Sequence, residues 1–272
     1  NKDINIKIAL GQSHLNLEHN DDALKFFNQV LEQQANNLSA LNNKGIALKN
    51  LKKIPEAIIT LQNALSMAPN QPAIIKNLAS CYTISGEYNH SKSLYKKAVK
   101  IEPTDIDAHH WLNQLLWENQ DPEFLDSYKF ALKTHNKSYQ LMLSMGHKLF
   151  LADRVDEAQD VLEQSIAVND KHVPSLVKLG TILRAQNQLD RSHHILQQAA
   201  NLAPNDSLAL EELAVSFIAI NKPKKALTLL NQLLVNTSNQ GLMSYKLIAL
   251  KLLNSPEYDY YCNLDHVLVT QI

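Results

Sequence analysis

The chain has 272 residues and a formal net charge of −1 at pH 7. This near-zero charge argues against a partner held mainly by electrostatics, so we expect neither nucleic acid nor an anionic membrane surface. The apolar stretches are far shorter than the about 20 residues of a membrane-spanning helix. Cys81 and Cys262 form no CxxC motif, which predicts buried thiols in a reducing, cytoplasmic compartment.

Small residues recur at a fixed spacing along the chain. Two series have a spacing of 34 residues, namely Ala23, Ala57 and Ser91, and then Ala158, Ser192 and Ala226. A period of this length predicts two-helix repeats, each of which buries its apolar face only by stacking on a neighbour. We divide the chain into seven repeats, at about 4–37, 38–71, 72–105, 106–138, 139–172, 173–206 and 207–238.

The second repeat, residues 38–71, shows the pattern most clearly. Its first helical stripe consists of Leu41, Gly45 and Leu48, and after a break at residues 52–55 the second consists of Ala57, Leu61, Ala64 and Leu65. We expect two antiparallel helices in which Gly45 faces Ala57. Other repeats carry a small residue at the same point of close approach, at Gly11, Ala79, Gly146, Gly180 and Ala214.

The fourth repeat, residues 106–138, departs from the pattern. It has 33 residues, its turn at 119–122 comes early, and a large side chain near Phe124 replaces the close-contact alanine. We expect a local change of superhelical bend there, not a domain boundary.

The C-terminal part of the chain breaks the period. Residues 239–253 are apolar on one face and look like the capping helix that such arrays need. Residues 254–272 form a non-repeat, extended tail whose last part, 267–272, is strand-like. Because a lone strand is not stable in water, the tail is expected to pack on the last helices, to mediate self-association with a second copy, or to begin a further domain.

Catalytic motifs are missing from the sequence. His19 and Asp21 make an HxD pair, but in a turn between two helices with no sheet to present them. The adjacent pairs His109–His110 and His193–His194 diverge on a helix, so one member of each should be packed and the other wet. We therefore expect no catalytic residue, no metal site and no cofactor.

The residues of the second repeat resemble those of tetratricopeptide repeat (TPR) proteins, and the resemblance covers about residues 4–238. It implies an all-α superhelical solenoid of about seven helix-turn-helix repeats with a C-terminal capping helix, over residues 1–253. It also implies a concave groove, lined by the first helices, that binds a protein or peptide segment. Carried over position by position, the groove consists of Asn42, Lys49, Lys76, Thr83, His110, Gln114, Trp117, His147, Phe150 and Arg184.

Within this groove we expect an anchoring pocket formed by His110, Gln114, Trp117, His147 and Phe150. The clamp with which some TPR proteins hold chaperone tails is not reproduced, because Ala73 and Asn77 stand where its cations belong. The alternative is that these helix faces are polar only because solvent covers them.

Residues 255–272 resemble the junction in bacterial proteins that join TPRs to a putative 2-oxoglutarate and iron(II)-dependent oxygenase. Two functions therefore stay open. The chain is either a non-catalytic scaffold or adaptor that binds peptides in its groove, or the substrate-recruiting N-terminal region of a larger enzyme. In the second case the iron-binding domain would lie beyond Ile272.

Overall fold

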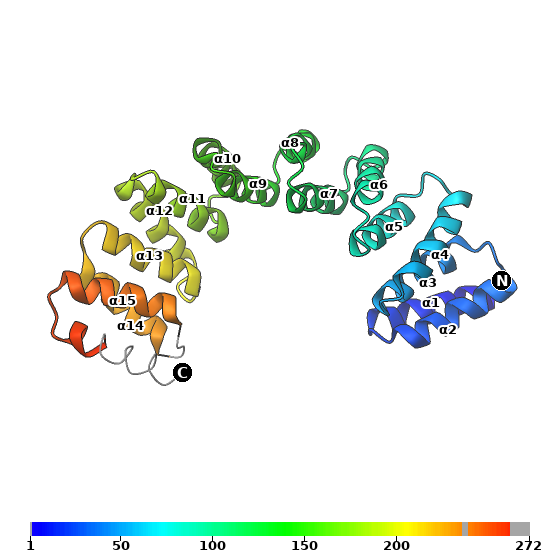
Figure 1. Ribbon diagram of the computed structural model, residues 1–272, viewed down its shortest axis with the longest axis horizontal. Coiled ribbons are helices and arrows are strands. Elements are labelled where there is room, and N and C mark those ends of the chain that lie inside the picture. The colour runs from blue at the N-terminus through cyan, green and yellow to red at the C-terminus, as the bar shows by residue number, and fades with distance from the viewer. Residues whose placement is uncertain (1, 236–238, 262–272) are drawn as a thin grey trace. The chain divides into compact units, whose positions relative to one another are not determined.

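The computed structural model describes residues 2–235 and 239–261. These residues form fifteen α-helices joined by short turns, and a short helical segment at residues 257–261 (Figure 1). In chain order the helices are α1 (Lys2–Asn16), α2 (Asn20–Gln33), α3 (Leu38–Asn50), α4 (Ile54–Met67), α5 (Pro72–Ile84), α6 (Tyr88–Ile101), α7 (Ile106–Glu118), α8 (Phe124–Thr134), α9 (Tyr139–Leu151), α10 (Val155–Val168), α11 (Val173–Ala185), α12 (Leu189–Leu202), α13 (Ser207–Ala219), α14 (Pro223–Leu234) and α15 (Gln240–Leu252). The all-α fold predicted from the period is confirmed.

The helices are distributed over two compact units. Unit 1 covers residues 1–136 and contains α1 to α8, and unit 2 covers residues 137–272 and contains α9 to α15. In both units each helix packs against the next one in the chain. The odd-numbered helices from α3 to α13 begin at the residues where the period places the start of a repeat: 38, 72, 106, 139, 173 and 207.

A left-handed residue ends the first helix of every repeat. Eight described residues have positive φ, and they follow one another at intervals of 33 or 34: Glu18, Lys52, Gly86, Gln120, Asp153, Asn187, Asn221 and Asn254. In repeat 2 the amide of Lys53 donates to the carbonyl of Leu48 (2.9 Å) and that of Lys52 to Lys49 (2.9 Å). This hydrogen-bond pattern is a Schellman cap, which satisfies the last carbonyls of a helix and reverses the chain.

The break predicted at residues 52–55 is shorter in the structure. Helix α4 already begins at Ile54, and Pro55 lies in its first turn. Proline is well tolerated at this position because the first amides of a helix have no partner within the helix.

The two helices of a regular repeat touch where one of them carries glycine. A Cβ atom added to Gly45 would lie 2.5 Å from Cγ of Leu61, and one added to Gly180 would lie 2.4 Å from Cγ of Leu196. The nearest side chain to Gly45 is thus Leu61, not the predicted Ala57. Ala57 is buried in the same core.

Repeat 4 has a different interior, as its sequence indicates. Asn113, only 1% exposed, occupies the position of the close-contact glycine, and neither of its amide atoms has a hydrogen-bond partner in the described residues. Leu125 stands in place of the alanine, and α8 has 11 residues against 14 in α4. The division between the two units lies after Asn136, and the change of superhelical bend expected in this repeat stays a prediction.

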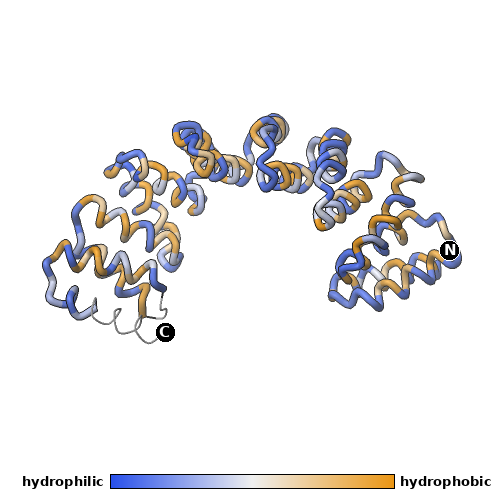
Figure 2. Tube along the Cα trace, in the orientation of Figure 1, coloured by the Kyte–Doolittle hydropathy of each residue, from blue (hydrophilic) through white to orange (hydrophobic). Residues whose placement is uncertain are grey.

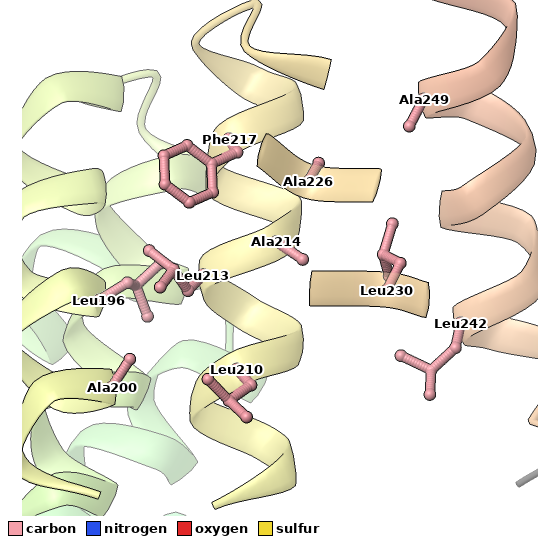
Figure 3. Packing of buried hydrophobic residues seen from close by; sticks show 10 residues of the cluster. All are labelled: Leu196, Ala200, Leu210, Leu213, Ala214, Phe217, Ala226, Leu230, Leu242 and Ala249. Carbon is pink, nitrogen blue, oxygen red and sulfur yellow. The ribbon is translucent and has the colours of Figure 1, made fainter. Parts of the chain in front are cut away.

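Figure 3 shows how buried residues pack between helices of unit 2. In unit 2, leucines and alanines of α12, α13 and α14 interlock, with Leu230 and Ala226 fully buried, and Leu242 and Ala249 of α15 complete the cluster. Each helix carries both apolar and polar residues along its length (Figure 2).

Helix α15 agrees with the capping helix predicted at 239–253, but its C-terminus resembles that of a first helix. Asn254 has φ 48°, and the amide of Ser255 donates to the carbonyl of Leu250 (3.0 Å). Residues 257–261, placed in an extended tail by the sequence, are helical. The reason is packing on α15, since Lys246 donates to the hydroxyl of Tyr261 (3.1 Å). The strand predicted at 267–272 lies outside the described residues.

Candidate functional site

The first helices of repeats 5, 6 and 7 form a groove in unit 2. Helices α9, α11 and α13 enclose a volume of about 390 Å³. The groove, called the unit-2 groove from here on, is lined by Gln140, Leu143, Ser144, His147, Pro174, Val177, Lys178, Thr181, Leu208 and Glu212. Its members repeat at intervals of 34, for example Gln140, Pro174 and Leu208. The groove is therefore a product of the repeat itself.

Apolar side chains make up the largest part of the unit-2 groove. Leu143, Pro174, Val177 and Leu208 come from all three helices, and Leu208 is 57% exposed. Because burying a leucine side chain is worth about 1.5–3 kcal/mol, this open apolar surface can hold an aliphatic side chain of a partner.

Polar groups on the same helices are only partly satisfied. The buried Nδ1 of His147 has no hydrogen-bond partner among residues 2–235 and 239–261. Nor does the ammonium group of Lys178 form an ion pair or hydrogen bond within this part of the chain. Burial lowers the pKa of Lys178, and the charge of Glu212 offsets that effect only in part. Burial, together with Lys178, also lowers the pKa of His147.

Glu212 has its own cation in Arg184. The Nη1 and Oε2 atoms lie 2.7 Å apart as an ion pair, although they are not aligned for a hydrogen bond. Both side chains are about four-fifths buried, so their charges largely cancel at this end of the groove. Burial raises the pKa of the neighbouring Glu211, and the charge of Glu212 raises it further.

A second concave site, the unit-1 hollow, lies on repeats 3 and 4. It measures about 330 Å³ and is lined by Thr83, Tyr95, His110, Trp111, Gln114, Leu115 and Glu118. Trp111 is 52% exposed, and its ring meets that of His110 edge-on at 5.3 Å between centroids. The hollow therefore offers an aromatic surface beside hydrogen-bonding groups.

Comparisons with known proteins agree with this architecture. The family model of the N-terminal TPR repeats region of Psidin matches residues 13–120, and a tetratricopeptide repeat model matches residues 177–240. The two TPR matches together cover more than half of the chain. In the solved structure of the C-terminal part of a TPR repeat-containing protein from Cytophaga hutchinsonii, 98% of that chain aligns with 88% of this one, with a TM-score of 0.71 and 12% identity.

The chain is a tetratricopeptide repeat protein. Among curated relatives of this TPR chain, the 131 kDa subunit of transcription factor tau from Saccharomyces cerevisiae is 30% identical over 44% of the chain. The Hsp70-Hsp90 organizing protein of Triticum aestivum is 25% identical over 65% of the chain and 33% of its own length. The chain spans between 12% and 31% of the length of the first three relatives.

The three cations predicted for the TPR groove contact neighbouring repeats. Lys49 donates to Ser80 Oγ (3.4 Å), and Lys76 forms an ion pair with Asp105, the N-cap residue of α7. Arg184 is paired with Glu212. These contacts connect the first helix of one repeat to the next one, so the three cations brace the TPR array.

The other predicted groove residues have varied surroundings. Asn42 accepts a hydrogen bond from Asn77 Nδ2 (2.8 Å). Thr83, His110 and Gln114 line the unit-1 hollow, whereas the ring of Trp117 packs on Phe124 at 5.2 Å.

The anchoring pocket predicted for this TPR chain draws its residues from both units. His110, Gln114 and Trp117 belong to unit 1, and His147 and Phe150 belong to unit 2. His147 lines the unit-2 groove, and Phe150 is half-buried on the same helix, α9. The pocket that would combine His110 and Trp117 with His147 and Phe150 stays a prediction.

Several lining residues of the two sites were missed at the level of sequence. In the unit-1 hollow these are Tyr95, Trp111, Leu115 and Glu118, and in the unit-2 groove they include Leu143, Lys178 and Leu208. A usable signal existed, because carrying one TPR position through every repeat connects Ser144, Lys178 and Glu212 at intervals of 34.

The histidines serve packing in this TPR fold. His109 is fully buried with Nε2 donating to the carbonyl of Pro103 (3.0 Å), while His110 is exposed. His193 packs on Phe217 and His194 is exposed, so both pairs behave as predicted. His19 occupies the N-cap position of α2, and its side chain makes no capping hydrogen bond there. Within the described ranges no three His, Cys, Asp or Glu side chains group as metal ligands, and no helix there is long and apolar enough to span a membrane.

Proposed function

We propose that this chain is a protein-interaction scaffold that holds an extended peptide segment in the unit-2 groove. The observation that carries the proposal is the groove itself, in which apolar side chains of three successive first helices alternate with polar ones. Burial of an apolar anchor supplies affinity, and polar groups that pair with peptide N–H and C=O groups supply orientation. The reducing compartment inferred from the cysteines leads us to propose a cytoplasmic location.

Repeat geometry favours an extended ligand. Packed helices lie about 8–10 Å apart, and an extended chain rises about 3.3 Å per residue. About every third residue of such a ligand would therefore meet the equivalent position on the next first helix. The unit-1 hollow, with Trp111 exposed beside Gln114, is proposed as a second contact of the same kind.

Relatives support a role in protein assemblies. The Hsp70-Hsp90 organizing protein and subunit 3 of the anaphase-promoting complex of Schizosaccharomyces pombe are among the curated matches, the latter 21% identical over 73% of this chain and 36% of its own length. The alternative, a substrate-recruiting region of an oxygenase, stays a prediction.

The test is selection of peptides from a displayed library of random 12-residue sequences. Leu208→Arg puts a charge into the groove, and Leu202→Arg makes the same change outside it, at the end of α12, where Leu202 is 41% exposed. Selected peptides should lose at least about tenfold in affinity, equal to 1.4 kcal/mol, for Leu208→Arg and keep their affinity for Leu202→Arg. Failure to select any peptide, or equal loss for both variants, contradicts the proposal.

A further inference from the structure

Equivalent positions along the unit-2 groove carry different charges, and this difference indicates which class of peptide the groove binds. Ser144, Lys178 and Glu212 occupy the same position on α9, α11 and α13, at intervals of 34 residues. The first is neutral, the second is a cation without a partner in the described chain, and the third is an anion paired with Arg184. One unneutralised positive charge therefore lies in the middle of the groove.

This charge is held where water solvates it poorly. Lys178 is half-buried, and its neighbours in the groove include Val177, Pro174 and Leu143. A cation in such surroundings gains more from a hydrogen-bonded carboxylate than a surface lysine does, because the charge is already partly desolvated. His147, whose buried Nδ1 atom has no hydrogen-bond partner in the described residues, lines the same groove.

We infer that the unit-2 groove recognises a peptide segment with one acidic side chain that has aliphatic side chains within three residues on either side. The carboxylate binds Lys178, and the aliphatic side chains cover the apolar surfaces around Leu143 and Leu208. The inference rests on the proposed function and adds the class of peptide that the groove selects.

A run of acidic residues is disfavoured by the same geometry. Glu211 and Glu212 lie on α13, one repeat beyond Lys178, and Glu211 has no cation within the described residues. A second carboxylate, three residues further along the ligand towards α13, would approach Glu211, whose charge is not offset by a cation of the described residues. The recognised segment is thus mostly apolar with a single negative charge, unlike the acidic tails held by clamps of several cations.

The experiment compares peptides selected by three proteins from the same displayed library of random 12-residue sequences. Lys178→Met removes the central charge and keeps an unbranched side chain, and Lys171→Met removes an exposed charge in the turn before α11. The pools selected by the unmodified chain and by Lys171→Met should be enriched in single Asp or Glu residues flanked by Leu, Ile or Val. The pool selected by Lys178→Met should lose the acidic residue and keep the aliphatic ones.

A matched pair of synthetic peptides gives the magnitude. One selected peptide and its Glu→Gln analogue, both with amidated C-termini, should differ about tenfold in affinity for the unmodified chain, as expected for a hydrogen bond between charged groups. For Lys178→Met the difference should fall below about twofold.

The outcomes separate the inference from the proposed function. The inference is overturned by pools without acidic enrichment, by an unchanged pool for Lys178→Met, or by binding that needs a free C-terminal carboxylate. In each of these cases, loss of binding by Leu208→Arg still supports the proposed groove. If the unmodified chain selects no peptide, or if Leu208→Arg binds every selected peptide as well as Leu202→Arg does, the proposed function fails and the inference fails with it.

Discussion

Replacing Gly45 with alanine probes the contact that defines a regular repeat. The added Cβ would lie 2.5 Å from Cγ and 2.7 Å from Cδ2 of Leu61, which is fully buried. Leu61 has little room to move, so the helices α3 and α4 must separate. Overpacking of this kind lowers the free energy of unfolding by about 1–3 kcal/mol. The higher helix propensity of alanine offsets about 1 kcal/mol of this loss. We expect a net loss of stability of about 1 kcal/mol.

The assay combines urea unfolding with amide hydrogen exchange. Because repeats couple mainly to their neighbours, exchange should accelerate in repeats 1 to 3 and remain unchanged in unit 2. Leu61→Ala alone should cost about 2–5 kcal/mol. In the double variant the new methyl group at position 45 occupies part of the space left by Leu61, so its loss should be smaller than the sum of the single losses by about 1 kcal/mol.

Two results would refute this reasoning. The first is a Gly45→Ala variant with an unchanged urea midpoint, which would mean that the two helices do not approach closely. The second is additivity of the two substitutions to within about 0.5 kcal/mol, which is the behaviour of residues that do not touch.

Three further predictions concern repeat 4 and the unit-1 hollow. Asn113→Ala should stabilise the protein by about 1 kcal/mol, because it removes a buried amide without hydrogen bonds; a lower urea midpoint would show that the amide has a partner. Burial opposes a low pKa for Asp121, but hydrogen bonds from Lys92 and Tyr88 outweigh it and lower the pKa to about 2. Since the pKa of an aspartate in the unfolded chain is about 3.9, this carboxylate stabilises the fold fully above pH 4, and the stabilisation is lost as the pH falls towards 2. Asp121→Asn should remove this part of the pH dependence of stability. The same loss of stability at low pH in the variant would argue against it. Trp111→Ala should change stability by less than about 0.5 kcal/mol and weaken peptides bound at the hollow, whereas Trp117→Ala should lower the urea midpoint, since its ring packs on Phe124; the reverse pattern would contradict the placement of the two rings.

The architecture could be predicted from the sequence because the two helices of each regular repeat pack against each other in the same way. Gly45 and Gly180 mark the close approach, and the starts of six first helices follow from the period. The turn was harder to recognise, since the left-handed position is held by glycine only in repeat 3 and by residues such as Lys52 and Asn187 elsewhere. Its chemistry varies because the Schellman cap depends on backbone hydrogen bonds.

The site was predicted less well, for a physical reason. Residue type shows that a side chain is polar, but not which neighbour satisfies it. Lys76 was predicted to face a ligand and is instead paired with Asp105, whereas Lys178 was overlooked and has no such partner in the described chain. Trp111 and Trp117 also have different surroundings. They lie six positions apart on one helix, and at about 100° per residue six positions correspond to a rotation of 600°. The two side chains therefore leave the helix in different directions.

The most direct test of the account is to locate a bound peptide on the protein. A photo-crosslinking benzoylphenylalanine is introduced at Leu208, in the unit-2 groove, or at Leu202, which is similarly apolar and exposed but outside the groove. A peptide selected by the unmodified chain should crosslink strongly at position 208 and at background level at position 202. Equal labelling of the two positions, or stronger labelling at 202, would contradict the claim that the concave face of α9, α11 and α13 is the binding site.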